Sequence, residues 1–460
     1  MPSKYLNHVP VFLFVLLMLC FRLNLYAQIN HLQTDTVRTS DHVYQNADAY
    51  KAFLEKTANE NTSLLNSKLQ KQYRKIIAEK NAGLIKQLNE KGFLFDAAAY
   101  PYLNSIFDHI LDANSLDKNR FHFFIDRTLA ANAYSYEDGT VVCDLGLVSI
   151  MENESQIAFV FCHELGHYLL KHVNTEIVKQ LEKYNSPEFL ARVKSIKKQS
   201  YNTKNKLEDL LADEVFDRRK HNRFQERAAD SLGMLLFMHT NYSCKMIPRV
   251  FDLLDAAESK TAICKIGTFF KQEGISIDED GLKPANIMSF GKPVKKDVVD
   301  ALKTHPDCAQ RKITMQSFFD QHPKPGVEFF IGTPQKLSAI KKTALFDEAA
   351  YLKENDNLSF YFYQLIQNNA QFPSNKYIKT EIFNTLLSVC SHYQAHTLYM
   401  VVSNQYAPDD DKDEYAKLLK LFDSLSLKEM KEIAITYYQN NKSLINASKE
   451  AINNLNKLNN

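Results

Sequence analysis

The amino-acid sequence contains no tryptophan, no arginine-rich run and no pair of cysteines in C-x-x-C spacing. A formal net charge of +2 over 460 residues, without a basic run, argues against a nucleic-acid partner. Without C-x-x-C spacing, the scattered cysteines do not predict a zinc site of their own. With 45% apolar and 24% charged residues, the composition is typical of a globular protein of two or three domains.

Long apolar runs are also lacking beyond the N-terminus, so we expect no later membrane helix. The N-terminus has Lys4, an apolar stretch from Val9 to Phe21 and a small residue at Ala27, which is the pattern of a signal peptide. Arg22, directly after the apolar stretch, leaves an uncleaved anchor as the alternative. We therefore expect cleavage near Ala27 and an exported protein, periplasmic or secreted, that is able to rest on a membrane surface.

Hydrophobic periodicity predicts helices on both sides of a mixed region that contains short strands. The expected regions are 1–27 (signal peptide), 28–95 (helical), 96–325 (mixed) and 326–460 (helical). The predicted strands are 121–126, 132–136 and 140–143, with a turn at 137–139. Helices are predicted in the mixed region at 157–170, 173–221 and 222–239, and in the last region near 359–371, 376–405, 412–423 and 427–457. The C-terminal helices resemble stacked pairs and offer a surface for a protein partner.

The stretch FCHELGHYLLKH, residues 161–172, places several polar side chains in an apolar helical segment. On a helix, His163 and His167 lie one turn apart on one face and can reach a single ion. Glu164 stands beside the first histidine and can reach a water on that ion without binding the ion itself. Asn153, followed by Gln156, predicts the helix start. The pattern H-E-x-x-H alone can arise by chance, but burying two histidines without a shared partner is costly.

A catalytic zinc needs a third protein ligand and an open position for water. His172 is at the wrong distance for the pattern of three histidines and is interpreted as a residue at the helix end, where a cation is favoured. Glu208 and Asp213 are candidates, but Glu226 is better, because Asp230 follows it at i+4 and can accept a hydrogen bond from a ligating imidazole. The alternative is that both acids form an exposed edge paired with nearby arginines.

Four segments, in this order along the chain, resemble the gluzincin peptidases that include HtpX and the CAAX prenyl endopeptidase: NAYSYEDGTVVCDLGLV, HELGHYLLKH, NRFQERAADSLG and THPDCAQR. The resemblance covers residues 100–320, roughly. It implies one Zn²⁺ per chain, with Glu226 as the third ligand and Asp230 behind it. It also implies an α+β fold: a mostly helical zincin-type catalytic domain with a small β-sheet, followed by an all-α C-terminal region. Glu137-Asp138-Gly139 departs from the proline-glycine-glycine turn that is usual in the family.

The expected activity is zinc-dependent endopeptidase cleavage of exported or membrane-associated polypeptides, in protein quality control. Glu164 is the expected general base. The strand that contains Asn132, Ala133 and Tyr134 is expected to bind the substrate as an added strand. His305 is expected to donate to the oxyanion or to bind the zinc in a self-inhibited state, and Arg311 to position the substrate or the His305 loop.

Two other functions remain open from the sequence. The chain could be a chaperone or scaffold whose protease site is gated or little used, although an intact Glu164 argues against an inactive site. The zinc could also serve another hydrolase reaction, on small amides or esters.

Overall fold

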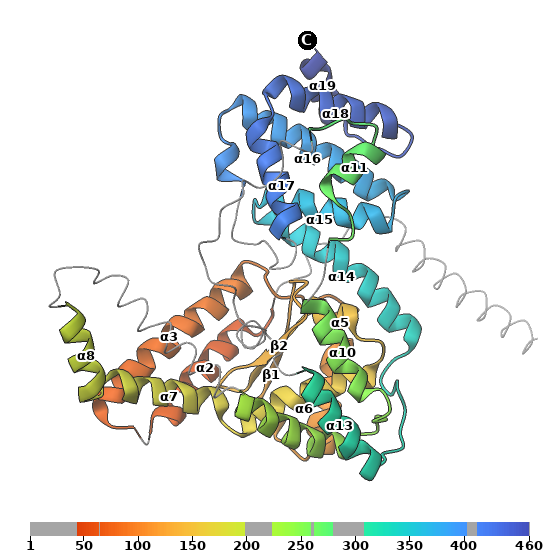
Figure 1. The fold of residues 1–460 in the computed structure, drawn as a ribbon. Helices are drawn as coiled ribbons and strands as arrows, with labels where there is room; N and C mark the ends of the chain where they lie inside the picture. The colour runs from red at the N-terminus through yellow and green to blue at the C-terminus, as the bar shows by residue number, and fades with distance from the viewer. Residues whose placement is uncertain are drawn as a thin grey trace, which may run out of the picture. The chain divides into compact units, whose positions relative to one another are not determined.

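The computed structural model describes most of the chain (Figure 1), namely residues 44–63, 65–197, 223–258, 262–278, 308–402 and 412–459. The fold is α+β and mostly helical, with one small sheet, as the sequence predicts. The predicted signal peptide lies outside the described residues. Within the described ranges, we find no helix with the length and apolarity needed to cross a membrane.

Tertiary contacts divide the chain into two compact units. We call residues 39–260 and 287–351 the sheet unit, and residues 261–286 and 352–460 the helical unit. The boundary expected at residue 325 therefore falls inside the sheet unit. Residues 261–286, which lie within the expected mixed region, are grouped with the C-terminal helices.

The sheet consists of β1 (His122–Asp126), β2 (Ala133–Ser135) and β3 (Thr140–Asp144), in the order β1-β3-β2. β1 runs parallel to β3 and β2 runs antiparallel to it, which leaves β2 at an edge. All three strands and the turn between β2 and β3 occur where the sequence predicts them. Gly139 in this turn has a φ of +98°, and a Cβ there would lie 2.2 Å from the carbonyl oxygen of Arg120. Only glycine fits that position.

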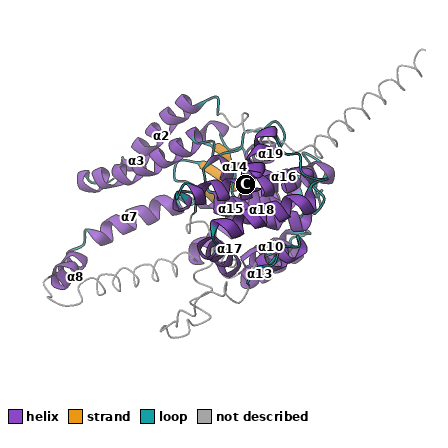
Figure 2. Cartoon of the chain, turned by 90° about the horizontal axis from the view of Figure 1, so that it is seen from above, coloured by secondary structure: helices purple, strands orange, loops and turns teal. Residues whose placement is uncertain are grey.

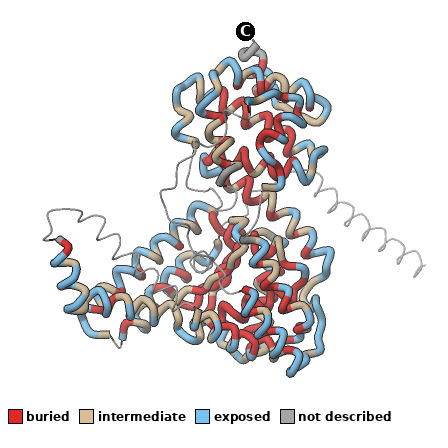
Figure 3. Tube along the Cα trace, in the orientation of Figure 1, coloured by how far each residue is buried: buried red, intermediate tan, exposed pale blue. Residues whose placement is uncertain are grey.

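Helices cover both faces of the sheet. Successive residues of a strand point to opposite sides, and apolar side chains on both sides of the strands need to be buried. Phe123 packs on one face, 5.3 Å from the ring of Phe107 and 5.1 Å from that of Phe161. Phe124 packs on the other face, 5.0 Å from Tyr50. Figure 2 shows α2 and α3 as adjacent helices, and Figure 3 shows buried segments in both units. The covering helices are α4 (Ala99–Ala113) and α6 (Glu154–Leu169) on the first face, and α2 (Ala47–Thr62) and α3 (Ser67–Asn89) on the second.

The start of α6 is anchored by a buried carboxylate. Asn153 caps the helix by accepting a hydrogen bond from the N–H of Gln156, as predicted. Glu154 is fully buried and accepts hydrogen bonds from the N–H groups of residues 330–332, at 2.6 to 2.8 Å. It also accepts from the hydroxyls of Tyr102 and Tyr242. These bonds fasten the loop before α14 (Pro334–Glu354) to the sheet unit.

The sheet unit contains further helices around this core. Of the long charged segment predicted at 173–221, the described part forms two helices that separate at Asn185 and Ser186. Residues 223–238 are helical, as predicted. The other helices are α5 (Leu145–Ile150), α7 (His172–Tyr184), α8 (Pro187–Lys197), α10 (Ile247–Glu258) and α13 (Cys308–Gln321).

The helical unit combines C-terminal helices with a short helix from the middle of the chain. In Figure 1 the green α11 lies among the blue helices. The side-chain amide of Gln367 accepts a hydrogen bond from the N–H of Cys264 at 2.9 Å and donates one to its carbonyl at 3.0 Å. This pairing holds the segment that precedes α11. The helices are α11 (Ile266–Gln272), α15 (Leu358–Gln371), α16 (Lys376–Gln394), α17 (Lys412–Ser424), α18 (Leu427–Asn441) and α19 (Lys449–Asn459).

Two of the predicted C-terminal helices are too long. The helix predicted at 376–405 ends at Gln394, and His396 adopts the left-handed conformation with a φ of +57°. The helix predicted at 427–457 is two helices, and between them the N–H of Asn446 donates to the hydroxyl of Thr380. Neither break contains proline or glycine, so side-chain periodicity alone does not reveal it.

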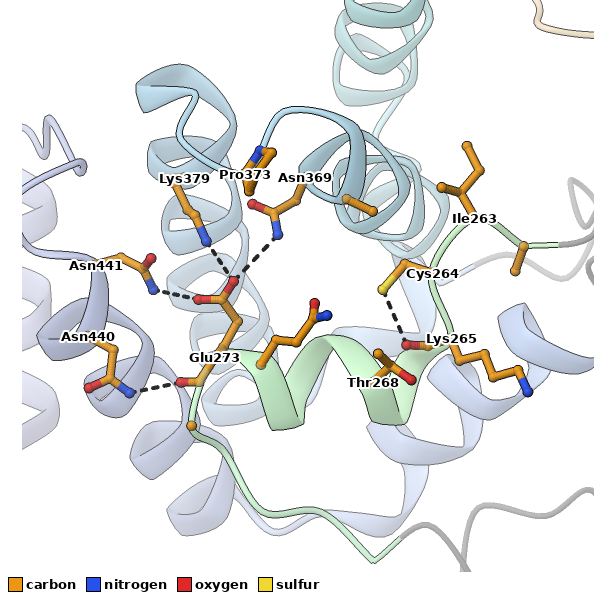
Figure 4. Close-up of a pocket in the computed structure, with 14 residues that line it drawn as sticks. Ile263, Cys264, Lys265, Thr268, Glu273, Asn369, Pro373, Lys379, Asn440 and Asn441 are labelled. Carbon is orange, nitrogen blue, oxygen red and sulfur yellow. Dashed lines mark hydrogen bonds and ion pairs between the residues drawn. The ribbon is translucent and has the colours of Figure 1, made fainter.

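A pocket of about 900 Å³ lies beside α11 in the helical unit (Figure 4). Glu273 projects into a ring of donors, accepting hydrogen bonds from Lys379 at 2.6 Å, Asn441 at 2.7 Å and Asn369 at 3.4 Å. All four side chains belong to buried residues. We call these four residues the Glu273 cluster.

Candidate metal centre

α6 carries two histidines whose rings converge. The Nε2 atoms of His163 and His167 lie 3.1 Å apart, as expected for residues one turn apart on the same face. Their side chains are 10% and 16% exposed. Imidazole nitrogens this close together and largely removed from water share either a proton, in a hydrogen bond, or a metal ion.

A carboxylate from a second helix completes the group. Glu226, on the helix at 223–238, places its two oxygens 3.5 Å from Nε2 of His163 and 3.4 Å from Nε2 of His167. Among the described residues, donor atoms of these three side chains all lie within 4.8 Å of one another. Ligands that surround Zn²⁺ tetrahedrally at about 2.0 to 2.1 Å are roughly 3.3 Å from each other. The separations of 3.1, 3.4 and 3.5 Å are close to this value, with a different oxygen of Glu226 facing each histidine, so a small rotation of the carboxylate would give a zinc ligand set.

Two glycines bring the two helices close enough for this arrangement. A Cβ on Gly166 would lie 2.8 Å from the carbonyl oxygen of Ala229, and a Cβ on Gly233 would lie 3.0 Å from the Cα of His163. The backbones are thus in near contact on either side of the donor group. Sequence reasoning missed this role, although both glycines stand inside the two motifs that it singled out.

Asp230 and Arg311 lie behind the donor atoms. Asp230 Oδ1 is 2.9 Å from Nδ1 of His163, on the side of the ring that faces away from Glu226. Arg311 of α13 donates two hydrogen bonds of 2.8 Å to the carboxylate of Asp230, and its Nη1 lies 3.1 Å from Glu226. Asp230 thus lies beside the imidazole of His163, and its role behind a zinc ligand stays a prediction. Arg311, predicted to position the substrate or the His305 loop, is buried against these two carboxylates.

The electrostatics of the group favour bound positive charge. Burial would lower the pKa of His163, but Asp230 and Glu226 raise it to about 10. Burial would raise the pKa of Glu226, but His163 and His167 hold it well below its usual range. The pKa of Asp230 is also lowered, by His163 and Arg311, against the effect of its burial. A cation at the centre is thus stabilised by carboxylates that stay ionised.

Glu164 follows the first histidine and is buried, with 8% of its surface exposed. Burial raises the pKa of Glu164, and positive charge on His167 and His163 lowers it in part. A carboxyl group whose pKa is raised in this way is suited to accept a proton and pass it on. Its position on α6 next to His163 is the one that the motif predicts.

His172 was not expected near the centre, but its ring reaches it. α6 ends at Leu169, and His172 is the first residue of α7, so the prediction that it ends a helix is wrong. Its Nδ1 lies 3.0 Å from Nδ1 of His167. Burial, followed by the nearby charge of His167, lowers the pKa of His172 to about 4.

The strand expected to receive substrate lies beside the metal helix. β2 contacts α6, pairs with β3 on one side and has no strand partner on its other side among the described residues. Asn132, just before β2, accepts a hydrogen bond from the N–H of Asp144. Ala133 is buried, and Tyr134 stacks edge-on with Tyr136, 5.5 Å away. Three other candidates, His305, Glu208 and Asp213, lie outside the described residues.

Comparison with known proteins gives a family match and short local alignments. The Beta-barrel assembly-enhancing protease of Escherichia coli (strain K12) is 33% identical over 72 residues, which are 16% of this chain and 15% of that protein. The protein of the same name from Yersinia pestis is 28% identical over 88 residues, which are 19% of this chain and 18% of that protein. The alignments thus span less than a fifth of either relative's length.

The family match covers residues 97–317, just under half of the chain. This range includes the sheet, α6, the helix at 223–238 and most of α13, which are the elements that build the centre described above. Residues 97–317 are therefore similar to Peptidase family M48, a family of metallopeptidases.

Proposed function

We propose that this protein is a zinc-dependent endopeptidase, with one Zn²⁺ held by His163, His167 and Glu226. The observation that carries the proposal is the convergence of their donor atoms: the two Nε2 atoms lie 3.1 Å apart, and each lies 3.4 to 3.5 Å from a different oxygen of Glu226, close to the spacing of tetrahedral zinc ligands. Two imidazoles and one carboxylate form the donor set of a catalytic zinc with a free position. The family match supports the same reaction class.

When bound, Zn²⁺ polarises the scissile carbonyl and lowers the pKa of a water molecule. Glu164 accepts a proton from this water as the oxygen adds to the carbonyl carbon. Glu164 then delivers the proton to the amide nitrogen as the C–N bond breaks, which releases an amine and a carboxylic acid. Asp230 and Arg311 keep His163 and Glu226 in place during these steps.

The substrate is a polypeptide that adds to β2 as a further strand. β2 contacts α6, near which the scissile bond must lie, and the side of β2 that has no strand partner among the described residues offers main-chain donors and acceptors. Main-chain pairing recognises an extended chain rather than one sequence, which suits a quality-control peptidase. Together with the predicted signal peptide, this favours exported or membrane-associated proteins as substrates.

Cleavage of an unfolded protein tests the proposal. The zinc-loaded chain should cleave casein, and Glu164→Gln at equal zinc content should reduce the rate about 10²- to 10⁴-fold, because the proton acceptor is lost. Equal cleavage by both proteins would exclude Glu164 as the base. No cleavage by either, with one zinc bound, would contradict the endopeptidase proposal.

A binding role is the second candidate, and the polar pocket of the helical unit is the observation that favours it. In this case the helical unit binds a protein partner and proteolysis is gated or rare. Full rescue of a deletion strain by Glu164→Gln would support the binding role, whereas failure of rescue by a stably folded Glu164→Gln would support the peptidase.

A further inference from the structure

The two zinc-facing histidines have different partners on the far side of their rings. His163 presents Nδ1 to the carboxylate of Asp230, at 2.9 Å. His167 presents Nδ1 to another imidazole, that of His172, at 3.0 Å. The centroids of these two rings are 4.9 Å apart, and the ring planes are nearly perpendicular, with an interplanar angle of 77°.

A break between two helices puts His172 in this position. α6 ends at Leu169, and Lys171 has a φ of +56°, in the left-handed region that reverses the chain direction locally. α7 then starts at His172. In an uninterrupted helix, residues five apart do not face each other, since neighbours lie at three and four positions. The left-handed residue thus brings the ring of His172 back to His167.

The proton positions follow from the donor geometry. His167 directs Nε2 toward Glu226, so in the ligating, neutral form its proton is on Nδ1. Nδ1 then donates, and Nδ1 of His172 must accept, which places the proton of His172 on Nε2. A ligating imidazole whose second nitrogen is hydrogen-bonded keeps one tautomer and one ring orientation.

We propose that His172 is a positioning residue that accepts the Nδ1–H of His167 and so holds Nε2 of His167 toward the zinc. It performs for His167 the role that Asp230 performs for His163, with a neutral acceptor in place of a charged one. This inference rests on the proposed zinc site, and it is tested by zinc affinity, which does not require peptidase activity.

The test compares the zinc dissociation constants of the full chain and its variants by competition with a chromophoric chelator. His172→Phe keeps a planar ring but removes the acceptor, and should weaken zinc binding about 10- to 100-fold. His172→Asn should bind nearly as tightly as the parent, because Oδ1 of asparagine occupies the place of Nδ1. His239→Phe, at an exposed histidine hydrogen-bonded to Asn114, is the matched control and should leave the affinity unchanged.

Folding of each apo variant is checked by its thermal transition. If His172→Phe does not fold, His172→Gln replaces it, since its oxygen lies one bond further out and should misplace the acceptor while remaining polar. Phe or Gln variants that bind zinc as tightly as His172→Asn and the parent would overturn the inference. A parent that binds no zinc would instead overturn the proposed zinc site itself, so the two failures are distinguishable.

Discussion

The donor group of the sheet unit and the Glu273 cluster of the helical unit are both buried and both contain charges of each sign. They differ in the balance of hydrogen-bond donors and acceptors. Around Glu273, one carboxylate is surrounded by an ammonium and two amides, each of which donates to it. At the metal centre, two imidazole nitrogens and a carboxylate, all able to act as acceptors, converge on one point. The carboxylate of the first cluster is matched by donors of the chain, whereas the acceptors of the second converge on a position suited to a cation.

This difference shows that burial and ion pairing do not by themselves identify a functional site. A buried carboxylate matched by donors stabilises a fold or specifies its packing. A cluster with an excess of acceptors keeps an affinity for something that is not part of the chain. Substitutions in each cluster test whether the two differ in this way.

The largest effect is expected for Lys379→Met in the Glu273 cluster. Removing one partner of a buried ion pair leaves the other charge uncompensated and costs about 3–5 kcal/mol of unfolding free energy. The two side chains are 6% and 8% exposed, so water cannot replace the lost partner. Urea unfolding measures the loss, and hydrogen exchange should locate it in α15 and α16. Zinc affinity should be unchanged.

The double variant Glu273→Gln/Lys379→Met is the control for this prediction. It removes both charges, so its loss of stability should be clearly smaller than that of Lys379→Met alone. A decrease in zinc affinity in either variant would show that the two clusters are coupled, and would contradict a purely structural role for the Glu273 cluster.

The next largest effect is expected from zinc itself. A ligand that binds the folded state alone adds about 2.7 kcal/mol of stability when its concentration is 100 times the dissociation constant. Calorimetry should show a raised transition temperature on adding zinc and its reversal by a chelator. In Glu226→Gln the shift should nearly disappear, because the charged third ligand is missing; an undiminished shift would place the zinc elsewhere.

A smaller effect is expected for Gly166→Ala at the contact between the two ligand-bearing helices. The added methyl group would meet the carbonyl oxygen of Ala229 at 2.8 Å and push the helix of Glu226 away from α6. We expect a destabilisation of about 1–3 kcal/mol together with weaker zinc binding.

Gly83→Ala is the matched control, because the glycine is exposed on α3 and nothing lies within 4 Å of its added Cβ. That variant should gain up to about 1 kcal/mol from better helix propensity and bind zinc like the parent. If Gly166→Ala binds zinc as tightly as the parent protein, the near contact of the two helices is not needed to position the zinc ligands.

Local features of this protein are predictable from the sequence. The three strands follow their runs of aromatic and β-branched residues, and the turn between β2 and β3 follows its glycine. Asn153 marks the start of α6 because an asparagine side chain can satisfy a free N–H at a helix end. The break after Asn441 is not predictable, because it involves a contact with the distant Thr380. The break after Gln394 is stabilised locally, by the N–H of Thr397 donating to the carbonyl of His392, and no proline or glycine marks it.

By itself, the sequence determined the facing pair of His163 and His167 with Glu164 beside them, because residues at i and i+4 meet on any helix. It also indicated Glu226 and Asp230 through their own i and i+4 spacing. Only the tertiary structure decided that Glu226 reaches the histidines, since this depends on the near contact of two backbones at Gly166 and Gly233. It also decided the partners of Arg311 and His172. Arg311 is distant in sequence from the carboxylates that it contacts, and His172 is separated from His167 by a helix break, so helical periodicity predicts neither contact.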